Sequence, residues 1–168
     1  MSPRAAWRLE SLGFSQVYDY AAGKLDWMAA GLATEGTGAA QPRGGGLARR
    51  DVPTCGLGDP LGEVAGRVRA QGWDACVVLN GEQVVLGLLR AAELAGDPSR
   101  TAEQAMRPGP STFRPHRRAA ELARVMQERR LPNVCITTSD GKLVGLVRRG
   151  DAAAALADGP PSRDPGDG

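Results

Sequence analysis

Apolar positions along residues 51–98 change from a helical spacing to two short continuous runs. The helical part predicts one apolar face formed by residues three and four positions apart, namely Leu61, Val64, Ala65 and Val68. The runs at 75–79 and 84–89 predict two strands, and the Asn80-Gly81 pair between them is typical of a hairpin turn. With a strand before the first helix and a short helix over 91–95, the unit has the order β-α-β-β-α.

The same pattern returns over residues 109–156, displaced by 58 positions without a gap. Gly87-Leu88-Leu89-Arg90 matches Gly145-Leu146-Val147-Arg148, and Glu93 matches Asp151. Such a repeat indicates one supersecondary unit that was duplicated, and neither copy is long enough to bury a good core alone. We therefore predict an α+β fold in which the two repeats pack together, with the functional site at the seam between them.

Composition divides the rest of the chain. Five of the seven aromatic residues precede residue 28, which suggests a separate N-terminal module. Glycine is frequent after that module, proline and glycine dominate the C-terminus, and Thr101 with Gln104 forms a capping box before the second repeat. The predicted units are a fragment at 1–35, a flexible linker at 36–50, a first repeat at 51–98, a second repeat with its leading helix at 99–157, and a disordered tail at 158–168.

Several classes of protein are disfavoured by composition. No apolar run approaches membrane-spanning length and no signal segment opens the sequence, so we expect a cytoplasmic protein. Three separated cysteines and one histidine give no pattern for a disulfide framework or a metal site. Residues 51–97 carry three arginines against seven carboxylates, whereas 107–151 carry nine arginines and a lysine against four. That polarity favours a head-to-tail homodimer.

The second repeat carries the motifs of a known family. They are Met106-Arg107-Pro108, then Leu131-Pro132-Asn133-Val134, and then Asp140-Gly141-Lys142-Leu143-Val144-Gly145-Leu146-Val147 leading to Arg148-Arg149-Gly150-Asp151. Together with the duplication, they resemble a tandem pair of CBS domains, a Bateman module, over residues 47–157. The resemblance implies a pseudo-twofold disc, often dimeric, with clefts that bind AMP, ADP, ATP or S-adenosylmethionine. It implies a regulatory module with no catalytic residue and no required cofactor.

The family's ribose site follows the pattern Gly-apolar-apolar-Thr/Ser-x-x-Asp. Asp151 matches its carboxylate, but arginine replaces the hydroxyl residue at both Arg148 and Arg90, and Glu93 replaces the aspartate in the first repeat. Arginine can bind phosphate through two hydrogen bonds. The predicted ligand-binding residues are Asp151, Arg148, Arg149, Val134, Arg90 and Glu93. The alternative is that Asp151 only caps a helix and that the arginines are solvated.

The first 35 residues resemble the C-terminal part of a rhodanese-like domain, with a helix-strand-helix order. The resemblance depends on Leu12-Gly13-Phe14, Val17-Tyr18-Asp19-Tyr20, Gly23-Lys24 and Trp27. That family uses a cysteine in a loop before the first of these helices, and the earliest cysteine here is Cys55, so we expect no enzyme activity in this chain.

Two alternatives to a nucleotide sensor follow from these observations. The chain could be the regulatory part of a rhodanese-like sulfurtransferase whose cysteine loop precedes this sequence. Because both ribose-site hydroxyls are replaced by arginine, it could also be a protein-interaction scaffold that binds no small molecule. The arginines of the second repeat lack interleaved aromatic residues, which makes a nucleic-acid partner the weaker expectation.

Overall fold

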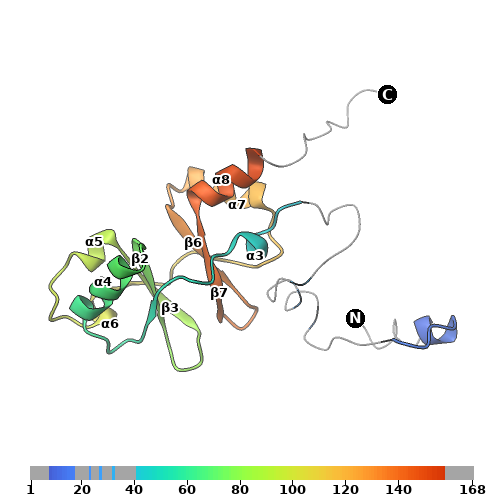
Figure 1. The fold of residues 1–168 in the computed structure, drawn as a ribbon, viewed down its shortest axis with the longest axis horizontal. Coiled ribbons are helices and arrows are strands. Elements are labelled where there is room, and N and C mark those ends of the chain that lie inside the picture. The colour runs from blue at the N-terminus through green and yellow to red at the C-terminus, as the bar shows by residue number, and fades with distance from the viewer. Residues whose placement is uncertain (1–7, 18–22, 24–26, 28–31, 33–40, 158–168) are drawn as a thin grey trace.

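The computed structural model describes residues 8–17, 23, 27, 32 and 41–157 (Figure 1). Residues 41–157 form two lobes of mixed helix and strand, which confirms the α+β class. The first lobe contains β1 (Thr54–Cys55), α4 (Leu61–Ala70), β2 (Ala75–Leu79), β3 (Val85–Arg90), α5 (Ala91–Leu94), α6 (Ala102–Ala105) and β4 (Arg107–Pro108). The second contains α3 (Gly44–Leu47), β5 (Thr112–Phe113), α7 (Ala119–Glu128), β6 (Asn133–Thr137), β7 (Leu143–Arg148) and α8 (Arg149–Ala157).

Each lobe has one small sheet with an apolar helix against it. The strand order is β1-β2-β3-β4 in the first lobe and β5-β6-β7 in the second, with one parallel pair beginning each sheet. All five residues of β2 and of β6 are buried, and the apolar positions predicted for α4 and α7 are the buried ones. Burial of these faces is the main favourable contribution to the fold.

The segment that precedes each repeat in the sequence packs on the lobe formed by the other repeat. Leu88 of β3 pairs with Arg107, and at the same offset Leu146 of β7 pairs with Arg49. The helices before those arginines follow the same rule, because α6 contacts α4 and β3 whereas α3 contacts α7 and β7. Each lobe is thus completed by residues that precede the other repeat in the sequence.

Two predicted boundaries are corrected by this exchange. The stretch from residue 41 to 50 is not a linker, because it contains α3, with Gly44 and Gly45 buried, and the Arg49 bridge; residues 36–40 lie outside the described ones. The leading helix assigned to the second repeat, α6, is capped by Thr101 as predicted but packs on the first lobe. Residue 44 is 58 positions before residue 102, so α3 and α6 are equivalent helices.

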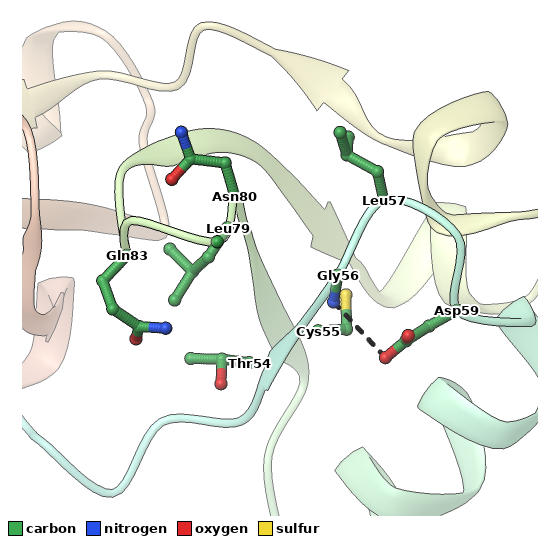
Figure 2. A pocket seen from close by; sticks show the side chains of 9 residues that line it. Thr54, Cys55, Gly56, Leu57, Asp59, Leu79, Asn80 and Gln83 are labelled. Atoms are coloured by element: carbon green, nitrogen blue, oxygen red, sulfur yellow. Dashed lines mark hydrogen bonds between the residues drawn. The ribbon is translucent and has the colours of Figure 1, made fainter.

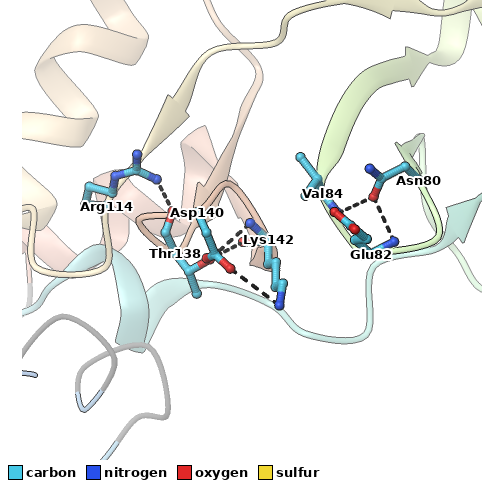
Figure 3. A network of polar contacts seen from close by, with 7 residues as sticks. All are labelled: Asn80, Glu82, Val84, Arg114, Thr138, Asp140 and Lys142. Carbon is cyan, nitrogen blue, oxygen red and sulfur yellow. Dashed lines mark hydrogen bonds and ion pairs between the residues drawn. The ribbon is translucent and has the colours of Figure 1, made fainter. Parts of the chain in front are cut away.

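The hairpins of the two lobes meet at the seam. Val84 bridges Lys142, where the Val85 N–H donates to the Gly141 carbonyl and the Leu143 N–H donates to the Gln83 carbonyl, both at 3.1 Å. Side chains brace each turn (Figure 3): the Asn80 Oδ1 accepts from the Glu82 and Val84 N–H groups at 3.0 and 2.9 Å. The hairpin predicted at Asn80-Gly81 is therefore confirmed.

A continuous apolar contact also crosses the seam. Leu146 of β7 and Cys135 of β6 are fully buried and belong to the same apolar cluster as Val77 and Leu88 of the first lobe. A second cluster, around Leu122 and Ile136, fills the second lobe. The predicted packing of the two repeats against each other is therefore confirmed.

Most residues of the proposed rhodanese-like fragment lie outside the described ones, as does the predicted tail at 158–168. Within the described part of that fragment, residues 8–11 are helical, and Leu12 and Phe14 after them are 59% and 60% exposed. The predicted helix-strand-helix order over residues 1–35 stays a prediction.

Candidate ligand-binding site

The predicted site residues lie where the last strand of each lobe meets the helix that follows it. Arg148 ends β7 and Asp151 is in the first turn of α8, while Arg90 ends β3 and Glu93 is in α5. Arg149, at the first position of α8, is exposed, and its N–H donates to the Pro132 carbonyl at 2.9 Å. These positions are related by the repeat, but their surroundings differ.

Around Asp151, residues from three parts of the chain come together. Arg148 places its guanidinium carbon 4.0 Å from the centre of the Trp73 ring, and Arg49 lies 5.0 Å from the same centre. Trp73 follows α4 of the first lobe, and Arg49 belongs to the exchanged segment. We call Arg49, Asp51, Trp73, Arg148 and Asp151 the Trp73 cluster. It spans the seam between the lobes.

Two polar atoms in the Trp73 cluster are buried without a hydrogen-bond partner among the described residues. They are Nε of Arg148 and Oδ2 of Asp151. A buried polar atom left unpaired costs about 1–3 kcal/mol. Arg49 does not pair with Asp151; its Nη2 binds the Asp51 carboxylate at 2.8 Å and lowers the pKa of Asp51. The cluster thus offers one donor and one acceptor to a molecule that enters it.

Around Glu93, the equivalent polar groups are satisfied by the chain itself. The Arg107 Nε donates to the Glu93 Oε1 at 2.6 Å, and the Arg90 N–H donates to the Glu93 Oε2 at 3.0 Å. The Arg90 Nε donates to the Asn133 Oδ1 at 3.4 Å. The Glu93 side chain is only 11% exposed. We call Arg90, Glu93, Arg107 and Asn133 the Glu93 cluster.

The Glu93 ion pair gives a test by pH. Burial opposes ionisation of Glu93, but the bonds from Arg107 and the Arg90 backbone outweigh it and hold its pKa below the ordinary 4.5. A lowered pKa contributes stability above the unfolded value, and this contribution is lost as pH falls through the folded pKa. We expect the melting temperature of Glu93→Gln to fall less steeply than that of the native chain from about pH 6 to about pH 3. Parallel curves would contradict the ion pair.

Val134 differs from the other predicted site residues. Its side chain is 1% exposed and belongs to the apolar cluster of the second lobe. The structure therefore shows Val134 as packing in β6, and a direct contact with a ligand finds no support in its position.

Sequence reasoning missed Trp73, Arg49, Asp51, Arg107 and Asn133 as members of these clusters. Arg49 was assigned to a linker, although its offset of 58 from Arg107 is visible in the sequence. Trp73 has Leu131 at the equivalent position, so the repeat gave no signal for an aromatic residue there. Both residues join the site only through the exchange of segments between the lobes.

Two pockets lie in the first lobe. One of about 480 Å³ opens between the end of β1 and the first hairpin, with Cys55, Asp59, Asn80 and Gln83 among its lining residues (Figure 2). Another of about 230 Å³ lies between α4 and α5 and includes Trp73. Because Arg49 and Arg148 cover the Trp73 ring, a ligand of the Trp73 cluster has to displace at least one of them.

Within the described part of the chain, no helix is long and apolar enough to cross a bilayer. The same residues contain no group of three or more His, Cys, Asp or Glu side chains placed to hold a metal ion.

Comparison with protein families identifies the second repeat, because residues 102–158 match the CBS domain family model. This part of the chain is similar to a CBS domain. Its match begins at α6, the helix that packs on the first lobe. None of the curated proteins matches the chain.

Several solved structures share the fold. The cytosolic domain of the Mg²⁺ channel MgtE in complex with ATP has a TM-score of 0.63 and 22% identity, covering 70% of this chain and 51% of its own. CBSX2 in complex with AMP has a TM-score of 0.60 and 16% identity, covering 66% and 91%. A CBS-domain protein from Agrobacterium tumefaciens has a TM-score of 0.57 and 27% identity, covering 64% and 85%. This chain thus spans about half the length of the MgtE domain.

Proposed function

We propose that this chain is a non-catalytic regulatory module that binds an adenine nucleotide at the Trp73 cluster. The observation that carries the proposal is the pair of buried, unpaired atoms, Oδ2 of Asp151 and Nε of Arg148. Two CBS-fold structures similar to this one contain ATP and AMP, which supports the choice of ligand class.

The ribose and the phosphate of the nucleotide each have a partner of suitable chemistry. Asp151 accepts hydrogen bonds from the ribose hydroxyls, as carboxylates do in other nucleotide sites. Arg148 and Arg149 donate to phosphate, helped by the N-terminal end of α8, where backbone N–H groups favour an anion. Phosphate oxygens thereby replace the Trp73 ring as the partner of Arg148.

The charges of the cluster favour a phosphate-bearing ligand over S-adenosylmethionine. The cluster itself has two guanidinium groups, of Arg49 and Arg148, and two carboxylates, one of which is already paired with Arg49. Arg149, next to Arg148 in the sequence, adds a third guanidinium group. A sulfonium cation gains nothing from this surplus of positive charge, whereas AMP, ADP or ATP neutralises it.

Regulation follows from the position of the cluster across the seam. A ligand that contacts residues of both lobes binds the closed arrangement better than any arrangement with the lobes apart, and it shifts the population accordingly. We propose that this shift is transmitted in the cytoplasm through a homodimer. The acidic first and basic second repeat favour a head-to-tail arrangement, and sedimentation as a salt-insensitive monomer would rule it out.

Calorimetric titration of Asp151→Ala tests the site. We expect the affinity for AMP, ADP or ATP to fall at least about tenfold, which is about 1.4 kcal/mol or more, because the ribose loses its acceptor. The melting temperature should not fall by more than about 1–2 °C, because Oδ2 makes no hydrogen bond whose loss would destabilise the lobe.

Asp97→Ala is the matched control, since Asp97 is exposed in the loop after α5 and bonds only within that loop. Its nucleotide affinity should equal that of the native chain, and S-adenosylmethionine should give no heat with either variant. A folded native chain that binds none of the three nucleotides would contradict the proposed function and favour a ligand-free scaffold.

A further inference from the structure

We infer that the two pseudo-equivalent clusters have different roles: the Glu93 cluster is closed by an ion pair of the chain itself, and one nucleotide binds per chain, at the Trp73 cluster alone. The binding part of this inference depends on the proposed function. The other part of the inference depends only on the geometry: the Glu93 cluster is closed by its ion pair, and the Trp73 cluster is open because it has no such pair between Arg49 and Asp151.

None of the buried side-chain polar atoms of the Glu93 cluster is left without a hydrogen bond. Both carboxylate oxygens of Glu93 are hydrogen-bonded, one to the Arg107 Nε at 2.6 Å and one to the Arg90 N–H at 3.0 Å. Asn133 is 4% exposed, and its Oδ1 accepts a hydrogen bond from the Arg90 Nε. A ribose or phosphate that enters here has to break a short ion pair first, one whose carboxylate is 11% exposed and whose guanidinium is 66% exposed. Binding is more favourable where donors and acceptors are still unpaired.

The Trp73 cluster contains the equivalent residues in a different arrangement. Arg49 is the counterpart of Arg107, and Asp151 is the counterpart of Glu93, yet the two do not bond. Arg49 instead lies over Trp73 and binds Asp51 at 2.8 Å. The hydrogen bond and charge of Asp51 are the main causes that raise the pKa of Arg49, and the charge of Asp151 adds a smaller contribution. Asp151 is therefore near Arg49 without a hydrogen bond between them.

Three differences between the repeats account for the two states. Asp151 is one methylene shorter than Glu93. Asp51 pairs with Arg49, and the equivalent position in the second repeat is Gly109. Trp73 lies under the Arg49 guanidinium, and its equivalent is Leu131. Because Gly109 and Leu131 have no group to hold Arg107, that arginine is left to Glu93. The asymmetry is therefore encoded in side chains at matched positions.

A double-mutant cycle measures the two states without any ligand. The double variant Glu93→Gln/Arg107→Gln should lose about 2–4 °C less in melting temperature than the sum of the two single variants, because either single change already removes the shared ion pair. For Asp151→Asn and Arg49→Gln, the two losses should add within about 1 °C. Additivity at Glu93, or coupling of equal size at Asp151, would overturn the inference.

Titration with ADP then counts the sites. The native chain and Glu93→Gln should each bind one ADP per chain with affinities within about twofold of each other, and Asp151→Ala should lose this binding. Two ADP per chain would overturn the inference while leaving the proposed function in place. Loss of binding in Glu93→Gln but not in Asp151→Ala would overturn the inference and also contradict the Trp73 cluster as the binding site. No binding by the native chain would contradict the proposed function, and the cycle would still decide between closed and open clusters.

Discussion

Replacing Leu146 with alanine is expected to lower the free energy of unfolding by about 2–5 kcal/mol. Leu146 is fully buried in β7, but its side chain packs in the apolar cluster of the first lobe. The substitution leaves a cavity at the seam, so both lobes lose packing at once. Urea unfolding followed by circular dichroism should show a single transition at a lower midpoint.

The control is the same chemical change at an exposed site. Leu12 is 59% exposed, and Leu12→Ala should change the free energy of unfolding by no more than about 0.5 kcal/mol. If Leu146→Ala costs less than about 1 kcal/mol, Leu146 is not part of a shared core and the account of the seam is wrong.

Replacing Gly145 with alanine is the second substitution with a large expected effect, about 1–3 kcal/mol or more. A Cβ atom at Gly145 would lie 2.6 Å from the Arg49 carbonyl oxygen and 3.0 Å from its carbonyl carbon. Because these are backbone atoms, the Arg49 segment has to move away from β7. The two hydrogen bonds between Arg49 and Leu146, at 2.9 and 3.0 Å, are then lost or stretched.

Gly87→Ala is the matched control, because Gly87 occupies the equivalent position in β3. The three nearest neighbours of a Cβ atom there would be Sδ, Cγ and Cβ of Met106, and rotation of the Met106 side chain can move the first two. Methionine can adopt another rotamer, so Gly87→Ala should cost clearly less in melting temperature than Gly145→Ala. Equal losses would mean that the Arg49 segment is as adaptable as a side chain, and would contradict its role as a fixed edge of the second sheet.

The elements that the sequence predicted best have strong apolar periodicity. The buried faces of α4 and α7, and the strands β2 and β6, follow directly from the spacing of apolar residues in each repeat. The offset of 58 also relates strand pairs in the structure. Leu88 pairs with Arg107, and the residues equivalent to them, Leu146 and Arg49, pair with each other. Local pattern and duplication were sufficient here because these elements bury whole apolar faces.

The sequence misled at α3 for a physical reason. Three consecutive glycines are poor helix formers, so Gly44-Gly45-Gly46 suggested a linker. The helix forms because Gly44 lies against Leu122 and Ile136, where an added Cβ would come within 2.9 and 3.1 Å of their side chains. Tertiary packing from residues more than 70 positions away outweighs the local preference, and no local pattern could show it.

The candidate site was predicted in part. Asp151 and Arg148 lie at the seam, and each has an unpaired buried atom. The resemblance could not reveal that Glu93 pairs with Arg107, because Arg107 comes from the exchanged segment. Several other arginines in the sequence were equally plausible ion-pair partners for Glu93. The difference between the clusters depends on three-dimensional neighbours and not on the motif that both repeats share.

The exchange of leading segments has a consequence for genetic truncation. A fragment of residues 102–158, the part that matches the CBS domain family model, would take α6 and β4 away from the lobe they complete and would lack the Arg49 edge that completes its own sheet. The open edge left on β7 could recruit the same stretch from a neighbouring polypeptide, a route to swapped oligomers and precipitation. Gene fragments that begin upstream of Arg43 avoid that hazard.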